Sequence, residues 1–211
     1  MKVYELYTSL QGETHYAGLP CTLVRFAACD LRCRYCDTEY AFHGGSERSI
    51  EEIVAEVKAR GVRLVLLTGG EPMLQRDLGA LAGRLLADGF EVMLETSGSH
   101  DVTTLPREVV KIVDVKTPGS GEAARNLWQN LARLEKKDAV KFVLTGESDY
   151  RFALEVIERY ALCAQTQVLL SPAWGLLEPR DLAHWMLRDH VDARLNLQIH
   201  KYVWGADARQ V

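Results

Sequence analysis

The sequence lacks the features that mark several large classes of protein. It has no apolar run long enough to span a membrane, no internal repeat, and no linker rich in proline, glycine and serine. Its formal net charge is −4, without the basic excess that accompanies sequence-independent binding of nucleic acid. The first five residues lack the apolar core of a secretory signal peptide. We therefore expect a cytoplasmic protein that binds neither membranes nor nucleic acids.

Cysteine is scarce, with five residues in a chain of 211. An odd number of cysteines without a secretion signal argues against a disulfide framework. A chain of this length buries enough apolar surface to fold without disulfides, and we expect one domain over residues 1–211. Three of the five cysteines nevertheless fall within eight residues. Such clustering indicates metal binding or redox chemistry.

Segments with the pattern of strands and segments with the pattern of helices alternate along the chain. Expected strands cover residues 3–8, 21–27, 63–68, 91–96, 109–116, 139–145, 167–170 and 193–199. Expected helices cover residues 49–61, where Ser49 and Glu52 form a capping box, and 74–88, 122–135, 149–160 and 179–188. This alternation is typical of βαβ units and a parallel sheet. The chain is shorter than the about 250 residues of an eight-unit barrel, so we predict an α/β fold with a partial, open (β/α)6-type barrel.

Polar or glycine-containing segments stand where the expected strands end. In a parallel sheet the carboxyl ends of the strands share one edge, and ligands bind there. We therefore expect one shared site built from residues 29–38, 68–72, 95–98, 114–117, 171–174 and 198–201.

The first motif is the C-x3-C-x2-C spacing of Cys29, Cys33 and Cys36. Three thiolates on one loop can bind three irons of a 4Fe-4S cluster and leave the fourth iron open. The amino and carboxylate groups of S-adenosylmethionine can fill that position. The alternative is a zinc site with His43 as its fourth ligand. We expect Cys21 and Cys163 to be buried and without a function.

The second motif, G-G-E-P, follows an expected strand. Gly69 and Gly70 let the backbone approach a ligand and expose N–H groups. Glu71 is a candidate to bind the ammonium group of an amino acid.

Together, the two motifs resemble the radical S-adenosylmethionine superfamily. Within it, the chain is similar to the 7-carboxy-7-deazaguanine synthase family of the queuosine pathway. Residues 7–13 resemble that family's T-x-Q-G-E, residues 25–31 its R-x-x-G-C-N-L, residues 36–38 its C-D-T, and residues 197–201 its Q-x-H-K. The chain departs from the family pattern at Thr14 and Ala28, where the family has glycine.

The resemblance implies a carbon–nitrogen lyase. Such an enzyme converts 6-carboxy-5,6,7,8-tetrahydropterin to 7-carboxy-7-deazaguanine and ammonia by a radical ring contraction, in the biosynthesis of queuosine and other 7-deazapurines. The implied cofactors are a 4Fe-4S cluster, S-adenosylmethionine and Mg²⁺. The implied partners are a reductant such as flavodoxin or ferredoxin and a second copy of the chain, giving a homodimer.

The resemblance also implies roles for individual residues. Cys29, Cys33 and Cys36 hold the cluster, and the hydroxyl of Thr38 binds Mg²⁺. The implied cofactor contacts are Tyr35, Cys36, Asp37, Gly69, Gly70, Glu71, Gly98, Asp114, Val115, Lys116, Ser171, Pro172, Ala173 and Trp174. The implied substrate contacts are Leu10, Gln11, Gly12, Glu13, Arg25, Thr96, His200 and the terminal Val211.

Three of these residues have plainer interpretations. Arg25 ends an apolar strand, where its guanidinium can form a forked contact with a carboxylate or an ordinary ion pair. Thr38 can cap a turn, and His200 can be a hydrogen-bonded core residue.

Two other functions fit parts of the sequence. A glycyl-radical-enzyme activase shares the cysteine motif, but the C-D-T and Q-G-E stretches argue against it. A non-catalytic iron–sulfur or zinc protein would leave Glu71 and the alternating α/β scaffold without a purpose.

Overall fold

The computed structural model describes residues 1–210, which form one curved sheet of nine strands. The strand order is β3-β1-β2-β4-β5-β6-β7-β8-β9. The strands are β1 (Lys2–Leu10), β2 (Pro20–Phe26), β3 (Ser46–Glu47), β4 (Leu64–Gly69), β5 (Glu91–Thr96), β6 (Val110–Asp114), β7 (Ala139–Leu144), β8 (Gln167–Pro172) and β9 (Arg194–Leu195). From β2 to β9 all neighbours are parallel, while β1 runs antiparallel to β2 and β3. Because β3 and β9 form separate edges, the prediction of a partial, open barrel is confirmed.

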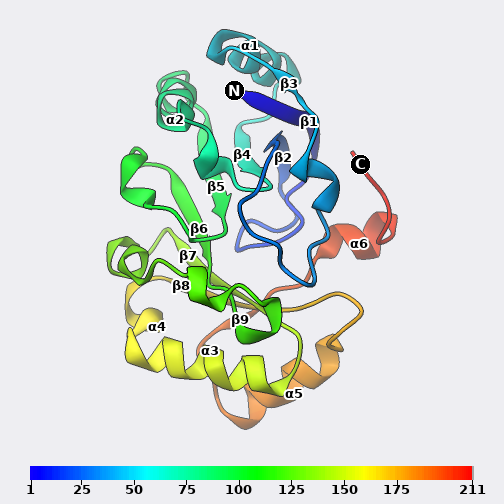
Figure 1. The fold of residues 1–211 in the computed structure, drawn as a ribbon, viewed down its shortest axis with the longest axis vertical. Coiled ribbons are helices and arrows are strands. Elements are labelled where there is room, and N and C mark those ends of the chain that lie inside the picture. Colours follow the sequence, from blue (N-terminus) through cyan, green and yellow to red (C-terminus); the bar gives the residue numbers. More distant parts are fainter. Residues whose placement is uncertain (211) are drawn as a thin grey trace.

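Helices cover the outer side of the sheet (Figure 1). They are α1 (Ile50–Arg60), α2 (Leu78–Ala87), α3 (Glu147–Arg159), α4 (Leu162–Gln165) and α5 (Pro179–Arg188). The last helix, α6 (Ile199–Trp204), does not belong to this outer layer. The predicted capping box begins α1, since Ser49 Oγ accepts from the Glu52 N–H and the Glu52 carboxylate accepts from the Ser49 N–H. Within residues 1–210, no helix has the length and apolar character needed to cross a membrane.

The alternation of side chains along each strand creates separate outer and inner cores. Val24 and Phe26 of β2 point outward into the layer beneath α1 and α2. A second outer layer lies beneath α3 and α5. Cys21 and Leu23, from alternate positions of β2, point inward and pack with inner residues of the other strands. This inner core fills only the lower part of the curved sheet, which leaves its carboxyl end open for a site.

The predicted helix over residues 122–135 is wrong. The segment forms only short 3₁₀ turns, at Ala123–Arg125 and Trp128–Arg133. Polar side chains of this segment bond to distant parts of the chain. Glu122 accepts from the backbone N–H of Arg32 at 2.7 Å, and Arg125 donates to Asp30 at 2.7 Å. These tertiary contacts with the cysteine loop outweigh the local helix pattern.

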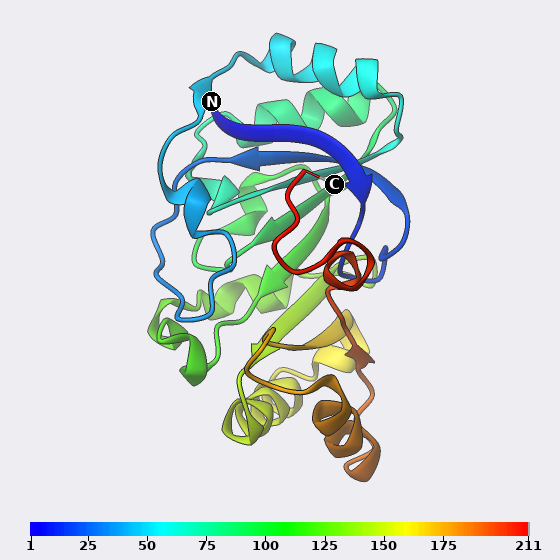
Figure 2. The ribbon, with the colours of Figure 1, turned by 90° about the vertical axis from the view of Figure 1, so that its right-hand side faces the viewer.

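The predicted strand over residues 193–199 is also wrong for most of its length. Pairing ends at Leu195, and α6 begins at Ile199. Asn196 instead bonds to β8 through both its backbone and its side chain, and the Ile199 N–H donates to the Gly12 carbonyl. The end of the chain therefore turns toward β1, where α6 and the following segment lie (Figure 2).

The two residues that stand where the family has glycine, Thr14 and Ala28, both have left-handed backbone conformations. Thr14 has φ 66° and Ala28 has φ 76°. A side chain in this region is strained against its own backbone. Glycine would remove this strain at either position, which explains why a related sequence would carry glycine there.

We expect Ala28→Gly to raise the free energy of unfolding by up to about 1 kcal/mol, because glycine adopts positive φ without a steric cost. The control is Ala55→Gly, at an exposed position of α1, which should lower the free energy of unfolding by about 1 kcal/mol because glycine weakens a helix. Urea unfolding of both variants measures the two effects. If Ala28→Gly had a lower free energy of unfolding than the wild type, the backbone of Ala28 would not be strained.

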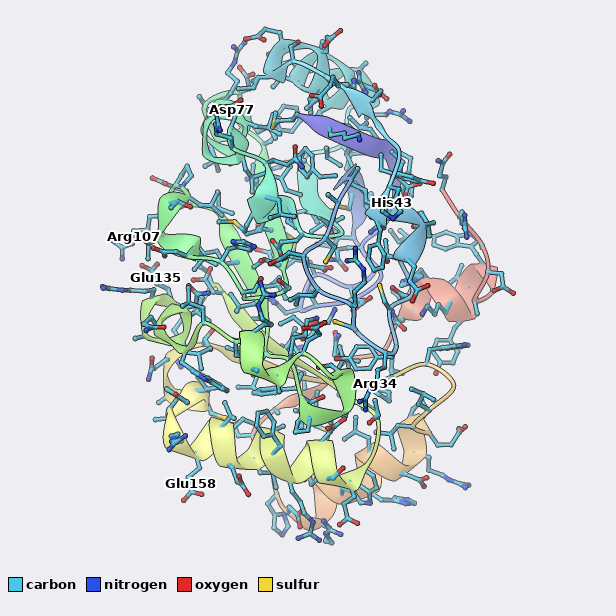
Figure 3. All side chains as sticks on the ribbon, in the orientation of Figure 1. Arg34, His43, Asp77, Arg107, Glu135 and Glu158 are labelled. Carbon is cyan, nitrogen blue, oxygen red and sulfur yellow. The ribbon has the colours of Figure 1, made fainter. Side chains whose placement is uncertain are left out.

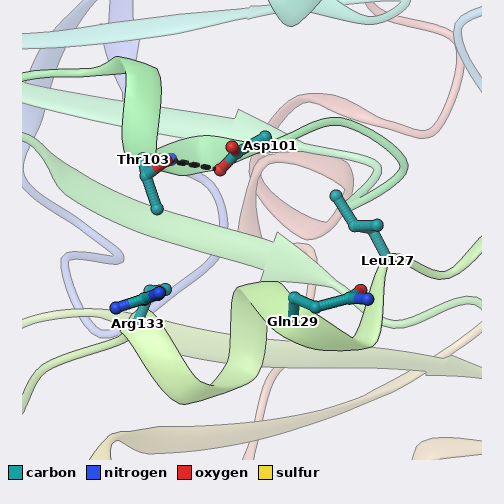
Figure 4. Close-up of a pocket in the computed structure, with 5 residues that line it drawn as sticks. All are labelled: Asp101, Thr103, Leu127, Gln129 and Arg133. Carbon is teal, nitrogen blue, oxygen red and sulfur yellow. Dashed lines mark hydrogen bonds between the residues drawn. The ribbon is translucent and has the colours of Figure 1, made fainter.

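We expect Asn130→Ala to lower the free energy of unfolding by about 2–4 kcal/mol, because it leaves buried backbone groups without partners. Asn130 is 1% exposed, accepts from the Val102 N–H, and donates to the carbonyls of Gly98 and His100. Its neighbour Gln129 is exposed at a small hollow of about 290 Å³ (Figure 4). Gln129→Ala should change stability by less than about 0.5 kcal/mol. Equal losses in urea unfolding would show that Asn130 has no special role.

Candidate active site

A cavity of about 970 Å³ opens at the carboxyl ends of the parallel strands. It is lined by the cysteine loop, the Gly-Gly turn after β4, the ends of β5, β6 and β8, residues 10–13 and the C-terminal segment. The shared site expected at the strand ends is therefore present, and it extends down into the interior of the sheet.

The cysteine loop forms one wall of this cavity. Cys29, Cys33 and Cys36 are free, half-buried thiols that line it, and burial raises the pKa of each. The loop is fixed from outside, since the Arg34 N–H donates to the Ser120 carbonyl at 3.0 Å. Figure 3 shows Arg34 at the edge of this loop. Cys21 is fully buried as expected, whereas Cys163 on α4 is only half-buried and donates to the Asp192 carbonyl. Neither lines the cavity.

The Gly-Gly turn packs directly against the cysteine loop. The Gly70 N–H donates to the Phe26 carbonyl, and the Glu71 N–H donates to the Ala28 carbonyl. A Cβ atom at Gly70 would collide with Ala28 and Cys29. The absence of a side chain therefore lets the β4 turn approach the thiols closely, which leaves its backbone facing the cavity.

The carboxylate of Glu71 does not line the cavity. It is fully buried and accepts hydrogen bonds from the Met73 N–H, the Thr96 hydroxyl and the Ser97 N–H at 2.7–2.9 Å. These donors occupy three of the roughly four acceptor positions of the carboxylate, so its visible task is to join the ends of β4 and β5. Thr96 borders the cavity, but its hydroxyl donates to Glu71 and not toward the cavity.

Most of the other residues expected to contact a cofactor do line the cavity. They are Tyr35, Cys36, Asp37, Gly69, Gly70, Asp114, Lys116, Ser171, Pro172, Ala173 and Trp174. Gly98 and Val115 do not, and Val115 packs in an outer core. Asp114 pairs with Lys116 at 2.8 Å, while its Oδ1 is buried and has no hydrogen-bond partner among residues 1–210. That oxygen is suited to accept a hydrogen bond from a ligand hydroxyl.

Thr38 and Asp37 connect the cysteine loop to the C-terminal helix. Thr38 donates its hydroxyl proton to Asp37 Oδ1 at 2.9 Å, which leaves the hydroxyl lone pairs for a cation. Asp37 Oδ2 accepts from Lys201 at 2.8 Å and from Gln198 at 3.0 Å. Burial opposes ionisation, but the Lys201 ammonium and these hydrogen bonds hold the pKa of Asp37 below its ordinary value.

The floor of the cavity carries Lys141, a charged residue that was not among the predicted site residues. Lys141 pairs with Glu13 at 2.5 Å, and Gln11 donates to Glu95 at 3.0 Å. Burial raises the pKa of Glu95, whereas the Lys141 ammonium lowers the pKa of Glu13 in spite of its burial. The available signal for Lys141 was a lone charge inside the apolar strand A-V-K-F-V-L.

Arg25 has a partner inside the protein. Its Nε donates to Glu5 at 2.7 Å, and the two side chains are 13% and 4% exposed. Glu5 was not among the predicted site residues. Because it pairs with Arg25, a substrate carboxylate is not needed to compensate the buried guanidinium. The contact with Glu5 uses only Nε, however, which leaves the terminal nitrogens of Arg25 for other contacts.

His200 borders the cavity beside the Gln11–Glu13 loop. A Cβ atom at Gly12 would overlap its imidazole ring, so glycine is required for this packing. Burial lowers the pKa of His200. Leu10, Gln11, Gly12, Glu13, Arg25 and His200 all line the cavity, whereas Val211 lies outside the described residues.

The donor set fits an iron–sulfur cluster better than a zinc ion. In residues 1–210, no three histidine, cysteine, aspartate or glutamate side chains converge closely enough to hold a single metal ion. A 4Fe-4S cluster binds each cysteine at a different iron and so allows the thiols to be spread out, while zinc requires them to converge. His43, the alternative zinc ligand, does not line the cavity; Figure 3 shows its position.

Comparisons with known proteins agree with this arrangement. Residues 23–115 match the model of the radical SAM superfamily. The chain is 44% identical to a 7-carboxy-7-deazaguanine synthase of Koribacter versatilis, with 100% of each chain covered, and 40% identical to one of Chlorobaculum tepidum, with 100% of this chain and 97% of the other covered. The crystal structure of QueE from Escherichia coli has the same fold, with a TM-score of 0.77 and 24% identity over 93% of this chain and 92% of the other. The chain therefore belongs to the 7-carboxy-7-deazaguanine synthase family of the radical S-adenosylmethionine superfamily.

Proposed function

We propose that the protein converts 6-carboxy-5,6,7,8-tetrahydropterin to 7-carboxy-7-deazaguanine and ammonia. The observation that carries this proposal is the joint placement of two groups in one cavity: three free thiols on its wall, and charged and amide side chains on its floor. The names of the similar proteins support it. The activity requires a reductant, for which a small electron-transfer protein such as flavodoxin or ferredoxin is suitable.

The cofactors would occupy the upper part of the cavity. Cys29, Cys33 and Cys36 would hold a 4Fe-4S cluster, and S-adenosylmethionine would lie between the Gly69–Gly70 turn and the Asp114–Lys116 pair. When bound, they would supply the radical chemistry that removes a hydrogen atom from the substrate. The Gly-Gly turn would let the cofactor approach the backbone, although the Gly70 N–H is not exposed as expected but bonds to the Phe26 carbonyl. The unpartnered Asp114 Oδ1 would offer an acceptor.

The substrate would lie on the charged floor. A pterin edge alternates hydrogen-bond donors and acceptors, and Gln11, Glu13, Glu95 and Lys141 offer both kinds. The terminal nitrogens of Arg25 would bind the substrate carboxylate, and the Thr38 hydroxyl would bind Mg²⁺, which prefers oxygen ligands. The apolar inner core below the floor excludes water from the lower interior of the sheet.

The proposal also covers domain organisation, oligomeric state and location in the cell. We infer a single domain, because one sheet extends through the described chain and both outer cores pack against it. We further infer that the protein is a homodimer, because most oligomeric enzymes of this kind are symmetric dimers. We infer from its composition that it is cytoplasmic.

Replacing Cys29, Cys33 or Cys36 by alanine should abolish both iron binding and product formation, because each thiol binds a separate iron. Cys21→Ser and Cys163→Ser are the matched controls and should retain both. Iron and sulfide analysis of anaerobically reconstituted protein, followed by incubation with S-adenosylmethionine and the carboxypterin and mass spectrometry of the products, tests the function. One equivalent of zinc with no uptake of iron would disprove it.

Thr38→Ala should raise the Mg²⁺ concentration needed for half-maximal turnover while leaving the iron content unchanged, because it removes one oxygen ligand. Thr38→Ser keeps the hydroxyl and should behave like the wild type. Turnover is measured across a Mg²⁺ titration after treatment with a chelator. If chelated and Mg²⁺-supplemented wild-type enzyme turn over equally, Mg²⁺ has no part in the reaction.

A further inference from the structure

The segment after α6 covers one side of the cavity. Residues 206–210 line the cavity, and the segment returns from α6 toward β1 (Figure 2). Two contacts fix its position. Gln210 Nε2 donates to Glu5 Oε2 at 3.1 Å, and the guanidinium of Arg209 lies 4.3 Å from the centre of the Tyr40 ring.

Arg209 differs from most of the cations that line the cavity. Lys116, Lys141 and Lys201 each pair with a carboxylate, and so does Arg25. Arg209 forms no ion pair with any residue in the described part of the chain, although it is held against an aromatic ring. Its charge is therefore available to an anionic ligand.

Arg34 is the other cavity cation without an ion pair among residues 1–210. It belongs to the cysteine loop, and its side chain packs beside Gly121. Arg34 therefore lies at the proposed cofactor end. The available guanidinium at the Arg25 end belongs to Arg209.

Arg25 and Arg209 meet at the same aromatic side chain. The Arg25 guanidinium lies 6.0 Å from the centre of the Tyr40 ring, which Arg209 also contacts. Glu5 links the same groups, because one of its oxygens accepts from Arg25 and the other from Gln210. The C-terminal segment is therefore positioned relative to Arg25 by a built set of contacts.

The charge of Arg25 alone is a weak attractant for an anion. Glu5 already neutralises it, so a substrate carboxylate arriving beside Arg25 would meet a neutral ion pair. A second guanidinium changes this balance, because the exposed Arg209 adds an unpaired positive charge and forked donors at the rim of the cavity.

We propose that Arg209 is a substrate-binding residue, which the C-terminal segment brings beside Arg25 to bind the carboxylate of the substrate. This inference rests on the proposed function and deepens it. The end of the chain then contributes to specificity, since it distinguishes a carboxylated pterin from a neutral one.

The test compares Arg209→Ala, Arg209→Lys and wild type as oxidised, reconstituted holoenzyme, which binds substrate without turning over. The dissociation constant is measured for the carboxypterin and for its neutral 6-carboxamide, and KM and kcat are then measured for the carboxypterin after reduction. Arg180→Ala is the matched control, because Arg180 is an exposed arginine on α5 outside the cavity.

Arg209→Ala should weaken binding of the carboxypterin and raise its KM roughly ten- to a hundred-fold, as expected for loss of a hydrogen-bonded charge. It should change binding of the carboxamide and kcat much less, and Arg209→Lys should recover part of the affinity. Arg180→Ala should match the wild type.

Two results would overturn the inference. One is unchanged binding of the carboxypterin by Arg209→Ala. The other is an equal loss of affinity for the carboxypterin and the carboxamide, which would show that Arg209 covers the cavity without recognising the carboxylate. If the wild type itself failed to bind the carboxypterin, the proposed function would fall and this inference with it. The wild-type measurement thus separates the two failures.

Discussion

The structure depends on one constraint: a curved sheet that does not close must fill its interior and still leave room for ligands. The inner core fills the lower part with apolar side chains. Residues 11–19 connect β1 to β2 and contact the start of β5 through Tyr16 and Glu91, and they meet the chain after β9 where the Ile199 N–H donates to the Gly12 carbonyl. The cavity is what remains above these two segments, so its shape depends on both ends of the chain.

Charge pairing allows this cavity to be polar. A buried charge without a partner is strongly destabilising. The inward-facing cations Arg25, Lys116 and Lys141 each have a carboxylate close by, in Glu5, Asp114 and Glu13. These pairs hold polar groups at fixed positions above an apolar core, which is the arrangement that a polar ring with many hydrogen-bonding atoms requires.

The 3₁₀ segment between β6 and β7 shows how the site alters the scaffold. An α-helix in this connection would bond its backbone N–H and C=O groups to one another. The segment instead bonds to the cysteine loop through Glu122 and Arg125 and to the β5 end through Asn130. A regular covering helix is therefore absent where the thiol loop needs support. The local pattern of residues 122–135 could not reveal this, because the bonds join segments far apart in the chain.

The sequence by itself determined the features that depend on local spacing. Apolar periodicity predicted most of the strands and the helices α1, α2, α3 and α5, and the C-x3-C-x2-C and G-G-E-P spacings predicted which loops form the site. Only the tertiary structure decided which charges meet. Glu5 joins Arg25 and Gln210, which are 20 and 205 positions away, and Glu13 joins Lys141, which is 128 positions away. The physical reason is that a buried ion pair depends on the three-dimensional approach of strand ends, and sequence periodicity carries no record of that approach.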